Sequence, residues 1–242
     1  HARDEVHNDP NAPIRFHRSF ISSVQPYHQD KTSEILALSK ELIRIPSVTA
    51  SPDERISAVR RAATLIYDFA REYGMGVRYY DQEKYPALLI GYPGQMYAPV
   101  MLAGHFDVVE PDPDDIQFIP RIEGDYLWGR GAADMKTVVG TFLIWMKDTF
   151  KLGDPYPPVN LLLIGNEENG ESEAMGTPQL LNLLRDDSGY QTDLLIAGER
   201  TGENGDECYG QICTENRGVM MFEIALHGAR SHTGVHRKPM DM

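Results

Sequence analysis

Apolar residues along the chain follow two periods, and these predict helices that alternate with strands. Over residues 32–45 they recur every three or four positions, which is typical of a helix with one buried face. A second helical stretch has Ser51 as its N-cap, a proline at its first position and Glu54 in a capping box, and it ends at Gly74 or Gly76. We therefore expect two helices before the first strand.

Short apolar runs then alternate with further helical stretches. Strands are expected at residues 77–80, 87–91, 100–103, 159–164 and 193–197, helices at about 135–151 and 177–185, and a loop or small hairpin at 111–128. The run at 100–103 is apolar at every position, as in a strand that is buried on both faces. This order predicts an α/β fold in which helices cover both faces of a mostly parallel sheet.

The pattern divides the chain into three regions. Residues 1–31 are polar, with three prolines and no period, which indicates an extended N-terminal arm. Residues 32–214 carry the α/β pattern. Residues 215–242 open with a new strand, "VMMFEIAL", followed by a turn rich in glycine and histidine. We expect this last region to begin a second, α+β domain that is cut short at Met242.

Composition narrows the classes of partner. The 242 residues include 36 acidic and 23 basic side chains, which give a net charge of −13. This charge disfavours nucleic acid and anionic membranes, which attract basic surfaces, and it is compatible with metal cations. No apolar run reaches the roughly 20 residues of a membrane-spanning helix. The two cysteines form no C-x-x-C pair, so a reducing, cytoplasmic setting is expected.

Acidic or imidazole side chains follow three of the predicted central strands. "VMLAG" is followed by His105 and Asp107, "LLLIG" by Glu167 and Glu168, and "LLIAG" by Glu199. The carboxyl ends of strands in an open α/β sheet border the crevice where ligands bind, so these side chains are expected to converge. One imidazole with several carboxylates suits zinc, cobalt or manganese better than calcium.

Each of these residues also has an ordinary structural interpretation. Asp134 precedes a predicted helix and by itself would be an N-cap. By itself, His105 would be a hydrogen-bonded residue at a strand end. Glu167, Glu168 and Glu199 would be loop charges. Their joint occurrence at strand ends favours a metal centre over separate structural roles.

Five stretches of the chain carry motifs with a common resemblance. "AGHFDVV", "LWGRGAADMK", "NEENGE" and "AGERTG" resemble four metal-site motifs, and "HGARSHTG" resembles a lid motif. The family they resemble is the dinuclear zinc amidohydrolases, which include acetylornithine deacetylase, succinyl-diaminopimelate desuccinylase, aminoacylase and carboxypeptidase G. The resemblance implies that residues 32–214 are a catalytic, metal-binding domain and that residues 215–242 begin a lid and dimerisation domain.

The resemblance also implies a ligand set for two zinc ions, with cobalt or manganese as possible substitutes. His105, Asp134 and Glu199 would hold one ion, Asp134 would bridge to the second, and Glu168 would bind that second ion. The second ion also needs a histidine that family members carry near their C-terminus, beyond the position of Met242 in this chain. The peptide bond between Asp134 and Met135 is expected to be cis.

The same resemblance assigns catalytic roles. Glu167 would be the general base, Asp107 would orient His105, and His232 would be a lid histidine that reaches the active site of the partner subunit. The implied function is hydrolysis of an amide bond in an N-acyl amino acid or a small peptide by a metal-activated water. A homodimer is expected for the full-length protein, with no nucleic-acid or membrane partner.

Two other functions remain open from the sequence. A related aminopeptidase branch of dinuclear zinc peptidases shares the His-x-Asp start and the paired glutamates, although "RGAADMK" and the lid-like segment fit it less well. The truncated chain could also be a catalytically inactive metal-binding fragment. A serine hydrolase is disfavoured because no G-x-S-x-G motif occurs.

Overall fold

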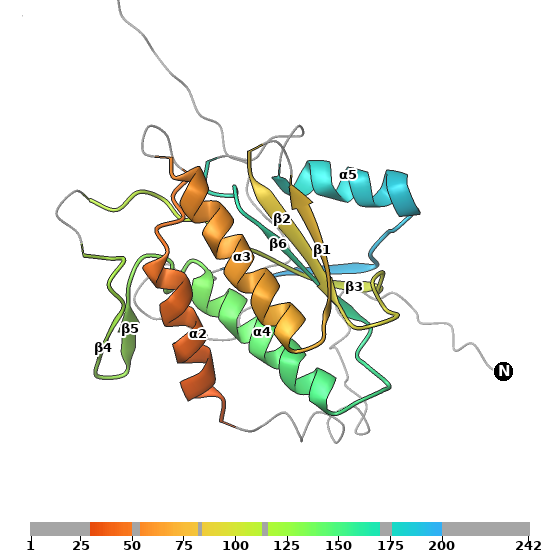
Figure 1. The fold of residues 1–242 in the computed structure, drawn as a ribbon, viewed down its shortest axis with the longest axis horizontal. Helices are drawn as coiled ribbons and strands as arrows, with labels where there is room; N and C mark the ends of the chain where they lie inside the picture. Colours follow the sequence, from red (N-terminus) through yellow and green to blue (C-terminus); the bar gives the residue numbers. More distant parts are fainter. Residues whose placement is uncertain (1–29, 50–53, 82–83, 113–115, 170–175, 200–242) are drawn as a thin grey trace, which may run out of the picture. The chain divides into compact units, whose positions relative to one another are not determined.

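The computed structural model describes residues 30–49, 54–81, 84–112, 116–169 and 176–199 (Figure 1). Its elements are α2 Thr32–Arg44, α3 Ile56–Glu72, β1 Gly76–Asp81, β2 Pro86–Gly91, β3 Val100–His105, β4 Arg121–Glu123, β5 Tyr126–Trp128, α4 Lys136–Lys151, β6 Val159–Ile164, α5 Gly176–Ser188 and β7 Leu194–Ala197. Contacts divide the chain into units His1–Arg200 and Thr201–Met242, and the described residues belong to the first. The predicted arm lies almost wholly outside the described residues, and the predicted second domain lies entirely outside them.

Five strands form one sheet in the order β1-β2-β6-β3-β7, and β4 pairs with β5 in a separate hairpin. Strand β2 is antiparallel to both of its neighbours, whereas β3 is parallel to both β6 and β7. Within the sheet that the described residues form, β2 alone therefore runs against the direction of the other four strands. This confirms the predicted α/β fold with a mostly parallel sheet.

Helices cover both faces of this sheet, as the sequence predicts. Alternate residues of β2 and β6 point to opposite faces, because side chains along a strand repeat with a period of two. One face packs against α3 and α4, with α2 packed in turn against α4, and the other face packs against α5 (Figure 1). No helix among the described residues is both long and apolar enough to cross a bilayer.

Strand β7 differs from its prediction. Its sequence is apolar at every position, like the central strands, but it is the outermost strand of the sheet that the described residues form. Leu194, Leu195 and Ile196 are 52%, 40% and 45% exposed. The apolar run therefore identifies the strand correctly but not its position in the sheet.

The predicted start of the second helix is wrong by several residues. Helix α3 begins at Ile56, its N-cap position is Arg55, and no side chain of the described residues caps it. Glu54 does not close a capping box, because its carboxylate accepts a hydrogen bond from the Tyr85 hydroxyl and pairs with Lys84 Nζ at 2.6 Å. Residues 50–53, which include the expected cap, lie outside the described residues. Glu54 therefore takes part in a tertiary contact and not in the helix cap that the local sequence pattern predicts.

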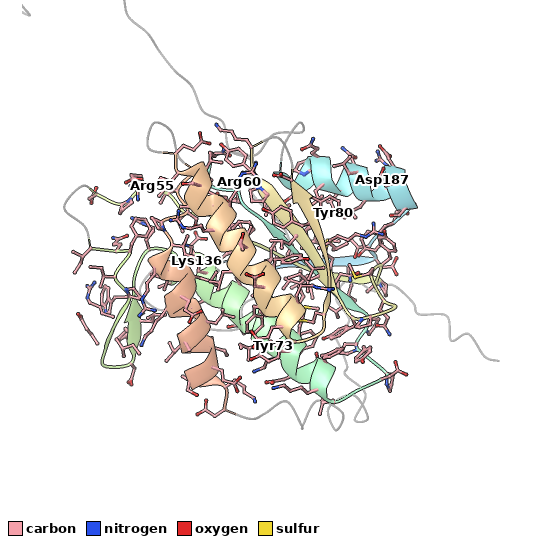
Figure 2. All side chains as sticks on the ribbon, in the orientation of Figure 1. Arg55, Arg60, Tyr73, Tyr80, Lys136 and Asp187 are labelled. Carbon is pink, nitrogen blue, oxygen red and sulfur yellow. The ribbon has the colours of Figure 1, made fainter. Side chains whose placement is uncertain are left out.

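A buried lysine joins the end of α2 to the start of α4. Lys136 is fully buried, and its Nζ donates hydrogen bonds to the carbonyl oxygens of Leu42, at 2.9 Å, and Ile45, at 2.7 Å (Figure 2). Both carbonyls lie at the C-terminal end of α2, and the Leu42 carbonyl also accepts a hydrogen bond from the Ile45 N–H at 3.1 Å. The lysine thus adds a donor at a helix end, where carbonyls have few partners within the helix. Burial lowers the pKa of Lys136 to about 7, although the charge of Asp107 opposes the shift. This contact fixes the first turn of α4 against the end of α2.

Candidate metal centre

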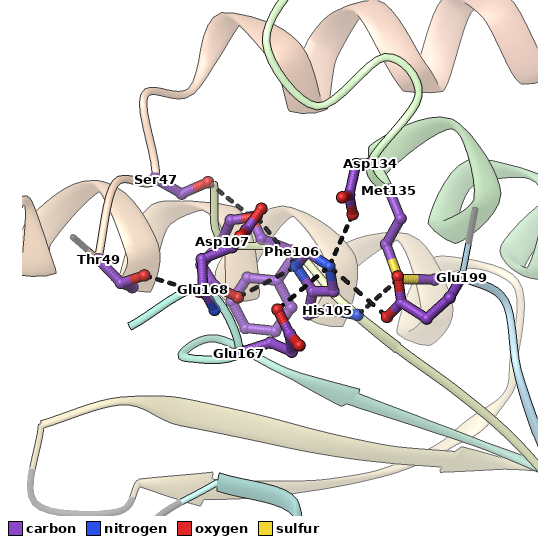
Figure 3. Close-up of polar contacts among 10 residues, drawn as sticks. All are labelled: Ser47, Thr49, His105, Phe106, Asp107, Asp134, Met135, Glu167, Glu168 and Glu199. Atoms are coloured by element: carbon purple, nitrogen blue, oxygen red, sulfur yellow. Dashed lines mark hydrogen bonds and ion pairs between the residues drawn. The ribbon is translucent and has the colours of Figure 1, made fainter. Parts of the chain in front are cut away.

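His105 is the last residue of β3, and its ring is enclosed by the protein. The side chain is 1% exposed. Its Nδ1 lies 3.2 Å from the backbone oxygen of Asp107 and 3.3 Å from the Oδ1 atom of the same residue. Both neighbours are acceptors, so Nδ1 carries the proton and Nε2 is the atom that points into the site (Figure 3).

Asp107 is buried completely, and three parts of the chain contact its carboxylate. Its Oδ2 atom accepts hydrogen bonds from the Thr49 hydroxyl at 2.7 Å and from the backbone N–H of Glu168 at 2.9 Å. Its Oδ1 atom faces His105. Asp107 therefore lies beside the imidazole of His105, as the sequence predicts.

Asp134 reaches the same imidazole from the segment before α4. Its Oδ1 atom lies 3.0 Å from His105 Nε2. It is not the N-cap of α4, since the helix begins at Lys136 and its N-cap position is Met135. The peptide bond between Asp134 and Met135 is cis, as expected. The N-cap interpretation of Asp134 is thus wrong, and the residue instead projects toward β3.

Met135 packs beneath the end of β3. The residue is fully buried, and its Sδ atom lies 3.3 Å from the backbone nitrogen of His105. Close approach is possible because residue 104 is glycine: a Cβ at Gly104 would lie 2.6 Å from Met135 Cε. The segment that carries Asp134 is therefore packed directly against the strand that carries His105.

Three glutamates complete the cluster from the ends of β6 and β7. Glu167 Oε2 lies 3.9 Å from His105 Nε2, and Glu199 Oε1 lies 3.8 Å from it. Ligand atoms of His105, Asp134 and Glu199 all lie within 4.8 Å of one another, and the same holds for His105, Glu167 and Glu168. The structure therefore brings together the imidazole, the three carboxylates expected as metal ligands and Glu167, the expected general base (Figure 3).

The pKa values of the cluster reflect several carboxylates gathered around one imidazole. Burial by itself disfavours a protonated His105, but Asp107 and Asp134 outweigh it and raise the pKa of the imidazole to about 11. Burial, reinforced by neighbouring carboxylates, raises the pKa of Glu168 to about 7 and also raises the pKa of Glu199, although His105 opposes both shifts. A divalent cation would compensate the carboxylates and would displace the proton from Nε2.

The donor set fits an ion of the zinc type. Metal-bound histidines usually donate their second ring N–H to a carboxylate or carbonyl, which fixes the ring and leaves the other nitrogen for the metal. Asp107 supplies both kinds of acceptor to Nδ1. His105 Nε2, Asp134 and Glu199 would hold one ion, and carboxylate oxygens with imidazole nitrogen are ligands that zinc, cobalt and manganese accept.

Sequence reasoning missed the residues that support the cluster from outside. Thr49 and Ser47 lie in "IPSVTA", a stretch that carries no ligand-type side chain, and nothing in the sequence indicates that it lies beside residues 106–108. In the structure, an isolated β-bridge between Val48 and Val108 brings the two stretches side by side. The proposed lid histidine, His232, lies outside the described residues.

Comparisons with known proteins identify a family whose model matches this chain. The model of "Peptidase family M20/M25/M40" matches residues 101–227, which is just over half of the chain. The match includes every residue of the cluster, from His105 to Glu199.

Two similar curated relatives have the same name. Succinyl-diaminopimelate desuccinylase of Ehrlichia ruminantium is 30% identical over 207 residues, which is 81% of this chain and 50% of the relative. The enzyme of the same name from Bordetella pertussis is 33% identical over 137 residues, which is 54% of this chain and 35% of the relative. The chain thus spans about half the length, or less, of these curated relatives.

Solved structures share the fold. Human carnosine dipeptidase 1 matches with a TM-score of 0.56 and 21% identity, over 75% of this chain and 41% of its own. An M20 family metallo-carboxypeptidase from Sulfolobus solfataricus matches with a TM-score of 0.52 and 19% identity, over 68% of this chain and 37% of its own. These similarities concern the fold alone.

Proposed function

Because the chain belongs to peptidase family M20/M25/M40, we propose that the protein hydrolyses an amide bond in an N-acyl amino acid or a small peptide in a metal-dependent reaction. The observation that carries this proposal is the convergence of one imidazole and four carboxylates at the ends of β3, β6 and β7 and before α4. The names of the curated relatives favour a succinyl group as the acyl part of the substrate.

The geometry and the family resemblance together support His105, Asp134 and Glu199 as ligands of one ion. The resemblance alone supports a second ion, which Glu168 would bind and to which Asp134 would bridge. When bound, two divalent ions lower the pKa of a water molecule toward about 7 and polarise a carbonyl group. Zinc is the expected metal, with cobalt or manganese as substitutes.

Glu167 is the proposed general base, and its surroundings differ from those of Glu168. The Glu167 side chain is 42% exposed and borders the His105 ring, so it can reach a water and a substrate. The backbone of Glu168 is instead held by Asp107, which suits a residue with a fixed ligand role. Glu167 would take a proton from the water and pass it to the leaving amine.

The remaining parts of the proposal rest on the family resemblance. His232 would stabilise the substrate carbonyl from the lid, across the interface of a homodimer, and the motif "HGARSHTG" supports this role. The enzyme would act in the cytoplasm. These points concern the full-length protein, since the chain spans about half the length of its relatives.

A second candidate is a metal-binding fragment without activity. The observation that favours it is that the cluster of described residues offers a single imidazole among its carboxylates. In this case the chain would bind a metal through His105, Asp134 and Glu199 and hydrolyse nothing.

One experiment separates these functions. The chain is incubated with Zn²⁺ or Co²⁺ and with N-succinyl-diaminopimelate, or with an unblocked dipeptide, and the products are quantified. The proposal predicts release of succinate that a chelator abolishes. Hydrolysis of the unblocked peptide alone would restrict the proposal to peptide substrates, which the aminopeptidase branch also cleaves, and would exclude the succinyl group. Metal binding without hydrolysis of either compound would point to the inactive fragment.

A further inference from the structure

Residues 47–49 run alongside the stretch that follows β3. The Ser47 hydroxyl donates a hydrogen bond to the backbone oxygen of Phe106 at 2.6 Å, and the Ser47 carbonyl accepts one from Val108 N–H at 3.0 Å. Thr49 N–H donates to the Val108 carbonyl at 3.3 Å. The backbone on either side of Asp107 is therefore bonded to this short segment, which continues the chain from α2.

Thr49 also contacts the side chain of Asp107. Its hydroxyl donates to Asp107 Oδ2 at 2.7 Å, and the two residues are 1% and 0% exposed. The second donor to the same oxygen is the backbone N–H of Glu168 at 2.9 Å. With Oδ2 held by two donors, the carboxylate can turn only its Oδ1 atom toward His105 Nδ1, which lies 3.3 Å away.

We propose that Thr49 is a positioning residue of the metal centre. Its hydroxyl fixes the rotamer of Asp107, and Asp107 in turn fixes the ring of His105 and the backbone of Glu168. One carboxylate thereby couples the end of β3 to the turn after β6, and the Thr49 hydroxyl keeps it in place. The consequence for metal binding rests on the proposed function, whereas the effect on the imidazole does not.

The chemistry of Thr49 distinguishes this role from simple packing. Valine has nearly the shape of threonine but lacks the hydroxyl, so Thr49→Val removes one donor to a buried carboxylate oxygen and keeps the volume. Thr49→Ser keeps the hydroxyl and removes a methyl group. Loss of a donor to a buried acceptor is costly, because no water can replace it. A packing role predicts the opposite order of effects for the two variants.

The test uses Thr49→Val, Thr49→Ser and a matched control, Thr141→Val. Thr141 is an exposed residue of α4 whose hydroxyl donates to the Thr137 carbonyl within the helix. The first readout is the NMR signal of the His105 Nδ1–H proton and its exchange with solvent in the chelator-treated chain. The second is the affinity for Co²⁺, measured from the visible absorption of the bound ion.

Thr49→Val is expected to shift the Nδ1–H signal, speed its exchange and weaken Co²⁺ binding about tenfold. Thr49→Ser should restore both, and Thr141→Val should change neither. Wild-type signals in Thr49→Val, or an equal defect in Thr49→Ser, would overturn the proposal. If the valine variant does not fold, Thr49→Ala is compared with Thr49→Ser by the same readouts. Failure of the wild-type chain to bind Co²⁺, with an intact Thr49 effect on Nδ1–H, would count against the proposed function alone.

Discussion

The two sides of the metal centre are built differently. On one side, His105 and Asp107 are 1% and 0% exposed, and the Asp107 carboxylate accepts hydrogen bonds from the Thr49 hydroxyl and the Glu168 N–H. On the other, Asp134, Glu199 and Glu167 are 51%, 45% and 42% exposed. The direction of the imidazole is therefore set by the fold, whereas the carboxylates remain accessible to water and ligand.

This difference assigns separate tasks to the two sides. Substitutions on the enclosed side should reduce metal affinity and folding stability together, because they leave buried polar groups without partners. Substitutions on the open side should change the chemistry and leave stability nearly unchanged. Four measurements test this division, and they are ordered by the size of the expected effect.

The largest effect is expected for Glu167→Gln on the open side. Removal of a general base typically lowers the rate 10²–10⁴-fold, and we expect a loss of succinate release in about this range. The free energy of unfolding and the metal content should remain those of the wild-type chain, because the side chain is 42% exposed. Glu72→Gln, at the exposed end of α3, is the control. Hydrolysis that survives within about tenfold would remove Glu167 from the mechanism.

A smaller effect is expected for Asp107→Asn on the enclosed side. The amide keeps the shape of the side chain but loses the charge that faces His105, and one of its hydrogen-bond positions becomes a donor that faces another donor. We expect metal affinity to fall about 10–100-fold and the free energy of unfolding to fall by about 1–3 kcal/mol. Calorimetric metal titration and urea unfolding measure the two effects, with the exposed Asp112 as the matched position. Unchanged metal affinity would show that His105 needs no carboxylate partner.

The pH dependence of stability tests the carboxylates. The pKa of Glu168 is raised from 4.5 to about 7, so the folded chain binds this proton more tightly than the unfolded chain. Its contribution to stability is fully present below the unfolded value and is lost as the pH rises through the folded value. In chelator, the melting temperature of the wild-type chain should therefore fall between about pH 5 and pH 6 relative to Glu168→Gln.

Two features make this comparison specific. The pKa of His105 is also raised, but its contribution is lost only as the pH rises above its ordinary value of 6.5. Added Zn²⁺ should remove the difference, because the ion compensates the carboxylate. Parallel melting curves of the two proteins across this range in chelator would contradict the raised pKa.

The smallest effect is expected for Lys136→Met, next to the enclosed side. The variant loses two hydrogen bonds to carbonyl oxygens of α2, but it also removes a buried charge, and the two changes partly cancel. We expect unfolding to become easier by about 1 kcal/mol with little change in metal affinity. Chemical unfolding beside Lys40→Met, a partly exposed position on α2, provides the measurement. A large loss of metal affinity would instead show that Lys136 belongs to the enclosed side of the metal centre.

Much of the fold was predictable because local pattern determined it. The four helices and five sheet strands were expected near their observed bounds, since each has a clear hydrophobic period or a short apolar run. The start of α3 was wrong because Glu54 pairs with Lys84 and Tyr85, thirty residues away in the sequence. The outer position of β7 in the sheet of described residues was missed because an apolar run of residues does not distinguish an edge strand from a central one.

The candidate site was predictable in its members but not in its support. The sequence shows that a glycine precedes both His105 and Glu199, but the reason for each glycine lies in tertiary packing. A Cβ at Gly104 would lie 2.6 Å from Met135 Cε, and one at Gly198 would lie 2.5 Å from Val138 Cγ1. The same holds for the contacts of Thr49, which depend on how two distant segments pack.

Anomalous X-ray scattering from crystals grown with Zn²⁺ tests the central claim most directly. Data collected on both sides of the zinc absorption edge locate the ion and identify it. The metal-centre account predicts a zinc peak bonded to His105 Nε2, Asp134 and Glu199. Absence of a peak there, or zinc bound only at other surface carboxylates such as Glu34 and Asp148, would contradict it.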